Sequence, residues 1–264
     1  MAGDLTISTI NGGAIGAKNA IINGNFGINQ RAVSGTVTLS AGVYGHDRFK
    51  AGASGCTYTF ATSNNITTLT ITAGSLIQVI EGINLQSGTY TLSWTGTAQG
   101  KIGGGSYAGS GVTGTVTGGT NLNIEFDTGT LSLVQLEAGS VATPFEHRQY
   151  GLELALCQRY YQRWQPGNSA LRIANGNSAS AIIGYPVIPF AVQMRVVPTA
   201  TNSAPSDWSL IDGSSPRVVS NINPPSNNTE WWAAFTCATG LITGRCVQLR
   251  SAASGAWLAV SAEL

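Results

Sequence analysis

The sequence predicts an all-β protein in which two β-sandwich domains are joined by one short α-helix. Short apolar and β-branched runs recur about every ten residues along most of the chain, with Gly, Ser, Thr and Asn between them. Only residues 148–165 have the spacing of a helix. Pro144 precedes this segment and Pro166-Gly167 follows it, so we expect strands on either side of a single helix.

The candidate strands share a length of about four to eight residues and a high content of Thr, Val, Ile, Leu and aromatic residues. In the first sandwich they are Thr36–Leu39, Thr57–Thr62, Thr67–Thr72, Ser75–Ile80, Thr89–Thr95, Asn121–Phe126 and Thr130–Leu136. In the second they are Leu171–Ala174, Ala181–Tyr185, Phe190–Val197, Val218–Ile222, Glu230–Cys237, Arg245–Arg250 and Trp257–Ala262. The stretch Gly100–Gly119 is too rich in glycine for a central strand, so it is expected to be a long loop or an edge hairpin.

These elements divide the 264 residues into four segments. Residues 1–20 are small, glycine-rich and aperiodic, and such a segment needs a partner to become ordered. We therefore predict an attachment segment over 1–20, a β-sandwich over 21–147, a linker helix over 148–165 and a second β-sandwich over 166–264.

The predicted helix carries two apolar stripes. One contains Leu154, Cys157, Tyr161 and Trp164, and the other contains Leu152, Leu156 and Tyr160. A helix with two apolar stripes cannot lie on one surface with its other side in water. We therefore predict that it is buried on both sides in a homo-oligomer, with Leu154, Cys157, Tyr161 and Trp164 as the interface candidates.

Composition excludes several kinds of partner. Charged residues make up 9% of the chain and the net charge is +1, whereas a nucleic-acid groove needs clustered Lys and Arg. No run of about eighteen apolar residues is present, so no membrane insertion is expected. The N-terminus lacks the features of a signal peptide, which predicts assembly in a cytoplasm. Neither nucleic acid nor membrane is an expected partner.

The four cysteines are few and irregularly spaced, unlike a disulfide framework. Cys237 and Cys246 are close enough in sequence to face each other across a hairpin. The alternative is that all four are reduced thiols that behave as small apolar side chains, and this is the interpretation we favour.

The residues available for catalysis are few. His46 and His147 are far apart in sequence, and no motif for a metal, a cofactor or a nucleophilic serine occurs. Glu125 and Asp127 share one face of a predicted strand, where they form either a cation or acid–nucleophile pair or a solvent-facing polar stripe. The polar stripe is the favoured interpretation. We therefore predict no cofactor, no metal and no enzyme activity.

Aromatic residues give a stronger functional signal. Trp208, Trp231, Trp232 and Trp257 lie within fifty residues of one another, and Asn227 and Asn228 precede the adjacent pair. Flat rings stack on sugars and amides bind their hydroxyl groups, so these six residues are the candidates for glycan contact. The alternatives are burial in the core and packing on a neighbouring subunit. Because neighbouring side chains of a strand point to opposite faces, Trp231 and Trp232 cannot both enter one core.

Several longer motifs identify a family resemblance. They are NAIINGNFGINQR at 19–31, GHDRF at 45–49, QLEAGSVATPFEHRQYGLELALCQRYY at 135–161, PFAVQMRVVPT at 189–199 and WLAVSAEL at 257–264. With these motifs the chain resembles phage tail fibres and related virion structural proteins. That group commonly carries N-G-x-F-x-x-x-Q-R followed by D-R-W, and Phe49 stands here where Trp is usual.

The resemblance implies an N-terminal jelly roll similar to carbohydrate-binding modules, then a short helix and a β-sandwich tip, in a homotrimer. It brings no catalytic or binding residue with it. The first hypothesis is a non-enzymatic virion fibre protein, assembled in the host cytoplasm, which attaches to other virion proteins through residues 1–20 and recognises a host surface polysaccharide with its distal domain. The second is a purely structural capsid decoration, head-fibre or tail-adaptor protein. The third is a glycan depolymerase or esterase.

Overall fold

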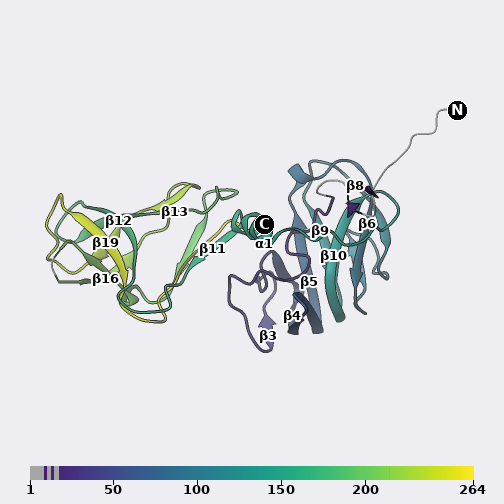
Figure 1. Ribbon diagram of the computed structural model, residues 1–264, viewed down its shortest axis with the longest axis horizontal. Coiled ribbons are helices and arrows are strands. Elements are labelled where there is room, and N and C mark those ends of the chain that lie inside the picture. Colours follow the sequence, from purple (N-terminus) through teal and green to yellow (C-terminus); the bar gives the residue numbers. More distant parts are fainter. Residues whose placement is uncertain (1–8, 11–12, 15–17, 214) are drawn as a thin grey trace. The chain divides into compact units, whose positions relative to one another are not determined.

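A computed structural model describes residues 9–10, 13–14, 18–213 and 215–264 (Figure 1). Strands dominate these residues, and the only α-helix among them is α1 (Tyr150–Gln158). The predicted all-β fold class with a single helix is confirmed. Most of the predicted attachment segment 1–20 lies outside the described residues, apart from the paired strands β1 (Thr9–Ile10) and β2 (Gly13–Ala14) near its middle and the last residues, 18–20.

The chain divides into two compact units. Unit 1 comprises Met1–Leu154 together with Leu264, and unit 2 comprises Ala155–Glu263. None of the helices in the described part of the chain has the length and apolar character needed to cross a membrane.

Unit 1 contains one branched sheet that folds around an apolar core. The strands are paired in the order β3-β4-β5-β10-β6-β8, and β9 joins β5 to β7. Tyr58, Leu92 and Phe126 are among the core side chains. The bounds are β3 (Val37–Leu39), β4 (Phe49–Ser63), β5 (Ile66–Ile80), β6 (Gly88–Thr95), β7 (Gly100–Ile102), β8 (Val112–Val116), β9 (Leu122–Phe126) and β10 (Gly129–Ala138), with a 3-10 turn, η1 (Gly82–Asn84).

The two predicted strands Thr67–Thr72 and Ser75–Ile80 are a single strand, β5, that continues through Gly74. Gly74 has φ +71°, and a Cβ atom there would lie 2.0 Å from the carbonyl oxygen of Gly55. The absence of a side chain therefore lets β4 and β5 stay paired through an irregularity in their register. Beyond it, β5 changes its second partner from β10 to β9.

Unit 2 contains two sheets that share one core. The smaller sheet has the order β11-β20-β14. The larger has the order β12-β19-β15-β16-β18-β13-β17, and β12 also pairs with β13, so that its pairings form a closed ring. The bounds are β11 (Tyr161–Trp164), β12 (Arg172–Ser178), β13 (Ile183–Pro189), β14 (Thr199–Asn202), β15 (Trp208–Ile211), β16 (Arg217–Ile222), β17 (Glu230–Trp232), β18 (Phe235–Cys237), β19 (Cys246–Ser251) and β20 (Leu258–Ser261), with a 3-10 turn, η2 (Pro205–Asp207).

The helix is shorter than predicted. It ends at Gln158, and Tyr161–Trp164 form strand β11, which pairs with β20. The backbone N–H of Ala262 also donates to the carbonyl oxygen of Tyr160, at 2.7 Å. Pairing with β20 gives the backbone of this aromatic segment its hydrogen bonds, and aromatic residues fit a strand well. Tyr161 and Trp164 therefore do not belong to a helical stripe.

The segment Phe190–Val197, predicted as a strand, is irregular. Its backbone bonds to loops: the N–H of Phe190 donates to Thr229 and that of Met194 to Asn228. The side chain of Met194 is fully buried. Contacts distant in sequence thus override the local preference for a strand.

Candidate functional site

Two of the four predicted glycan-binding tryptophans are core residues. Trp208 and Trp231 are both 0% exposed, so the prediction that they contact a glycan is wrong. Trp208 shares the inner face of β15 with Leu210. The ring nitrogen of Trp231 donates to the carbonyl oxygen of Asn223 at 2.9 Å, and its ring centroid lies 6.1 Å from that of Phe235.

Trp232 points the opposite way and is 49% exposed, which confirms the prediction that the adjacent tryptophans face opposite sides. The ring of Tyr185, on β13, lies beside it with centroids 5.9 Å apart and planes at 42°. Trp257 is half-buried, and the guanidinium of Arg163 lies 4.9 Å from its ring centroid. Trp232 and Tyr185 are therefore the aromatic rings that remain available on the outer surface of the ring of strands.

The predicted asparagines have structural partners. The side-chain oxygen of Asn227 accepts hydrogen bonds from the backbone N–H groups of Thr229 and Glu230, at 2.9 Å each. The side-chain nitrogen of Asn228 donates to the carbonyl oxygen of Met194 at 3.1 Å. Both amides hold the loop before β17, which leaves Trp232 as the candidate with the freest side chain.

The interface candidates are also placed mostly inside the chain. Cys157 and Tyr161 are buried, and Trp164 packs against the core of unit 2, with its ring centroid 5.9 Å from that of Phe190. Cys157 and Tyr161 have little or no surface to offer a second subunit, so the prediction is wrong for these two residues. Trp164 is half-buried, and its place in an interface stays a prediction. Leu154 is half-buried, whereas Leu152 of the second stripe is exposed.

The sequence did not reveal a polar row that crosses four strands beside Trp232. The register places Gln248 opposite Asn175, Asn175 opposite Val187, and Val187 opposite Trp232. The side-chain nitrogen of Gln248 donates to the side-chain oxygen of Asn175 at 3.2 Å, and Nε of Arg172 donates to Gln248. Residues that face one another across strands point to the same side of the sheet. We call this row, with its neighbours Asn177 and Tyr185, the polar face.

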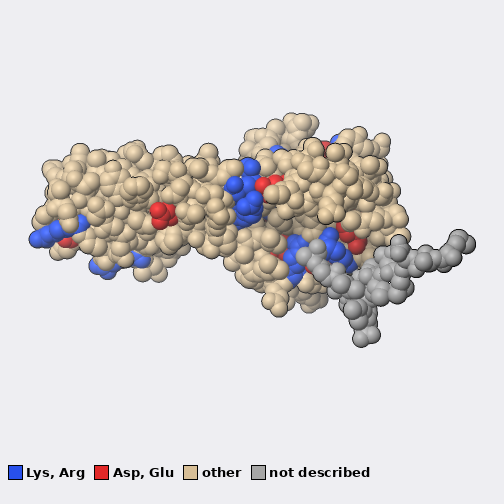
Figure 2. Space-filling model, turned by 90° about the horizontal axis from the view of Figure 1, so that it is seen from above, with Lys and Arg blue, Asp and Glu red and all other residues tan. Residues whose placement is uncertain are grey.

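A cavity of about 640 Å³ adjoins the polar face at β12, β15 and β19. Gln248 belongs to both the face and the cavity, and Arg172 of the cavity donates a hydrogen bond to it. The full lining is Arg172, Ile211, Asp212, Gly213, Pro216, Arg245, Cys246, Gln248 and Arg250. Most of the surface in Figure 2 carries no charge. Charged residues make up only 9% of the chain, so three arginines around one cavity are a local concentration of positive charge. In the sequence, the alternation of Cys246, Gln248 and Arg250 is the pattern that could have indicated this surface.

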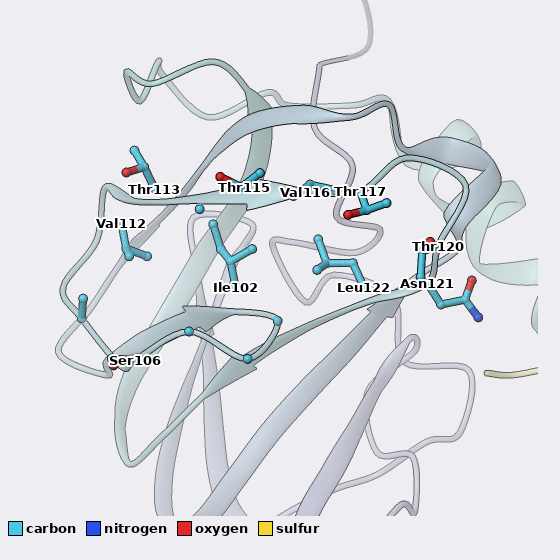
Figure 3. A pocket seen from close by; sticks show the side chains of 15 residues that line it. Ile102, Ser106, Val112, Thr113, Thr115, Val116, Thr117, Thr120, Asn121 and Leu122 are labelled. Atoms are coloured by element: carbon cyan, nitrogen blue, oxygen red, sulfur yellow. The ribbon is translucent and has the colours of Figure 1, made fainter.

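A second cavity of about 640 Å³ lies in unit 1, between the glycine-rich turn after β7 and strand β8 (Figure 3). Ile102 and Leu122 lie beneath the strand that carries Thr113 and Thr115. Its lining holds no aromatic ring and no charged group. The stretch Gly100–Gly119 is therefore neither one long loop nor an edge hairpin, because β7 pairs with β9 and β8 pairs with β6. The side chains around this cavity offer fewer recognition contacts than the polar face.

The predicted carboxylate pair has separate structural partners. Burial raises the pKa of Glu125, but hydrogen bonds from Ser75, Lys101 and Tyr107 outweigh burial and lower that pKa below its usual value. Asp127 accepts the backbone N–H of Gln99 at 2.6 Å. A carboxylate with a lowered pKa is a poor proton donor at neutral pH, so this geometry does not favour an acid–nucleophile pair.

The two histidines are unlike each other. His46 is buried in unit 1, where burial lowers its pKa to about 4, and its Nδ1 lies 2.9 Å from the hydroxyl oxygen of Tyr58. His147 is exposed, with its ring against Phe145. Among the described residues, no three His, Cys, Asp or Glu side chains are grouped to hold a metal ion.

The motifs that carry the family resemblance meet in a buried polar network in unit 1. The side chain of Asn23 bonds to both backbone groups of Ile28 and to the carbonyl oxygen of Asp47. From the linker segment, Arg148 donates to the carbonyl oxygen of Ile21 at 2.9 Å. Glu153 accepts the backbone N–H of Asn23. These motif residues therefore hold unit 1 together rather than form a surface site.

The polar face and its cavity are thus the candidate site on structural grounds alone. Compared with known proteins, the chain matches no protein-family model, no curated protein and no solved structure.

Proposed function

We propose that this chain is a non-enzymatic virion fibre protein, homotrimeric, whose unit 2 binds a host surface glycan through the polar face. The observation that supports this most strongly is that two outward rings, Trp232 and Tyr185, share one outer surface with the hydrogen-bonded amides of Asn175 and Gln248. The motif resemblance supports the virion part of the proposal.

The ring of Trp232 offers an apolar surface to a sugar. A half-exposed indole on a strand stacks on the C–H face of a pyranose and removes apolar area from water. The neighbouring Tyr185 ring is tilted by 42°, so the two rings present an angled surface rather than one flat plane. Such a surface suits a sugar chain better than an extended flat ligand.

The amides supply the polar contacts. Asn177 is exposed and has no side-chain hydrogen bond within the described residues, and the nitrogen of Asn175 is likewise not used by Gln248. An amide offers both a donor and an acceptor, which matches neighbouring hydroxyl groups on a sugar. Because these side chains project from paired strands, little backbone conformational freedom is lost on binding.

Each polar face is small, so one copy is expected to bind weakly. Three copies held in a trimer convert later contacts into intramolecular ones and raise the apparent affinity without any new contact. Light scattering that shows a stable monomer would contradict the proposed trimer but would not test the proposed binding surface.

A glycan array with fluorescently labelled full-length protein tests the proposal. Trp232→Ala is expected to weaken binding at least about tenfold, equivalent to about 1.4 kcal/mol. Val218→Ala is the matched control, because Val218 is also about half-exposed on unit 2 but lies on β16, outside the polar face. Unchanged binding by the Trp232 variant, or an equal loss in both variants, would refute the role of the polar face.

A further inference from the structure

The cavity beside the polar face concentrates positive charge in a chain that has little charge. Arg172, Arg245 and Arg250 line it, and Asp212 is the single acidic residue of the lining. The carboxylate of Asp212 already accepts the backbone N–H of Ile242 at 2.8 Å. Guanidinium groups of like charge repel one another, so their gathering in one cavity favours an anion among them.

Other arginines of unit 2 are used by the fold. Arg163 lies over the ring of Trp257, and Arg195 donates to the carbonyl oxygens of Ala262 and Glu263. None of the three cavity arginines is in an ion pair with a residue that the structure describes, and among them only Arg172 has a side-chain hydrogen bond, to Gln248. The Nε of Arg250 is buried without a hydrogen-bond partner there.

The cavity is continuous with the predicted sugar surface. From Gln248 on β19, the row crosses β12 and β13 to Trp232 on β17. Three strand spacings of about 4.8 Å give a span of about 14 Å. A short oligosaccharide that stacks on Trp232 can therefore extend along the row and place a substituent among the arginines.

We infer that the ligand of this surface is an anionic glycan, with a carboxylate or phosphate group held by Arg172, Arg245 and Arg250. The inference rests on the proposed glycan-binding function and adds its charge class. Arginine binds both groups through paired N–H donors, which gives geometric selection as well as attraction. Because the contact joins opposite charges that salt screens, binding should weaken as the salt concentration rises.

Matched acidic and neutral probes test the inference. Oligogalacturonate and its methyl ester share one sugar backbone, and the ester replaces each carboxylate by an uncharged group that is larger by one methyl. A phosphorylated mannan fragment with its dephosphorylated form provides the phosphate arm. Titration calorimetry with the full chain should show at least tenfold tighter binding of one acidic probe than of its neutral form at 50 mM salt. The arm that binds identifies the anionic group.

Variants then locate the anion. Arg245→Gln combined with Arg250→Gln should remove the preference for the acidic probe, so that the acidic and neutral forms bind alike, whereas Trp232→Ala should weaken binding of both forms and keep the preference. Lys101→Gln in unit 1 removes one charge outside the cavity and should change neither. Equal binding of acidic and neutral forms overturns the inference but leaves the proposed function standing. No binding of any glycan, acidic or neutral, overturns both.

The thiol of Cys246 gives a test that does not alter the arginines. Cys246 is exposed and lines the cavity. Iodoacetate adds a carboxylate to this thiol with loss of iodide, and iodoacetamide adds a neutral amide of nearly the same size. Carboxymethylated protein is expected to bind the acidic probe several-fold more weakly than carbamidomethylated protein, and Cys246→Ser should abolish the difference. Equal effects of the two reagents would contradict an anion site at this cavity.

Discussion

Glu153, in the first turn of helix α1, lies 3.3 Å from Nη1 of Arg148 and accepts the backbone N–H of Asn23, which is far away in sequence. The linker segment is thus fixed to the first motif of unit 1 through one carboxylate. Hydrogen bonds from a charged group and a backbone N–H make such a carboxylate costly to replace.

Replacement of Glu153 by Gln should destabilise unit 1. The amide keeps the shape but loses the charge that pairs with Arg148, so the free energy of unfolding should fall by about 1–3 kcal/mol. Denaturant unfolding followed by the fluorescence of Trp94, the tryptophan of unit 1, measures this change. Glu230→Gln, in unit 2, is the matched control and should leave this transition in place.

His46 should make unit 1 sensitive to acid. Its pKa is about 4 when folded and 6.5 as the unperturbed value, so the unfolded chain binds the additional proton. The contribution of His46 to the free energy of unfolding is therefore complete above about pH 6.5. It is lost as the pH drops towards 4, and the total loss is about 3 kcal/mol. Unfolding of His46→Gln should depend less on pH over that window. His147→Gln should retain the full dependence, and a wild-type slope in the His46 variant would contradict the assignment.

Adjacent tryptophans should differ in their effect on stability. Trp231→Ala removes a fully buried ring and should cost about 3–5 kcal/mol, whereas Trp232→Ala should cost less than about 1 kcal/mol. Thermal unfolding of unit 2 distinguishes the two variants. Similar losses would mean that Trp232 is held in the core and not on the polar face.

Gly74 should tolerate no side chain. Its left-handed backbone alone costs an L residue about 1–2 kcal/mol, and a Cβ atom would collide with the carbonyl of Gly55. Gly104→Ala is the control, since a Cβ atom there has open space. We expect a clear drop in the melting temperature of the Gly74 variant and almost none for the Gly104 variant.

One thiol should react in the native protein. Cys56, Cys157 and Cys237 are buried free cysteines, and Cys246 is exposed. Burial raises the pKa of Cys56 to about 11, which further lowers its reactivity. A thiol-specific reagent should modify one site per chain under native conditions, identified by peptide mapping, and all four in denaturant. Protection of Cys246 would show that a partner or a ligand covers it.

The local sequence pattern predicted those features of the fold that depend only on residues close together in the chain. Strand alternation placed Trp231 and Trp232 on opposite sides, and the Pro-bounded segment placed the helix. The strand at Trp208–Ile211 was not among the predicted strands, so the burial of Trp208, a candidate for glycan contact, could not be predicted from alternation. It also missed the strand at Tyr161–Trp164, because the hydrogen-bond partner of that segment lies a hundred residues later in β20.

The candidate site was harder to predict than the fold. The polar face is assembled from β12, β13, β17 and β19, and its row depends on the register of three separate strand pairs. Register is fixed by packing and turns over the whole domain, so no local motif encodes it. A search for polar residues that alternate within single strands would have found Asn175, Asn177, Gln248 and Arg250. It would not have shown that these residues lie close together on the folded sheet.

The pairing of β12 with β13 closes a ring in which β19, β15, β16 and β18 are the other members. Each strand of that ring is held by a neighbour on either side, independently of the side chains that point outward. Outward positions such as Asn177, Tyr185 and Gln248 can therefore change with little effect on folding. Under the proposed function, a lineage facing a changing receptor can acquire a new specificity by single substitutions, without first acquiring extra stability.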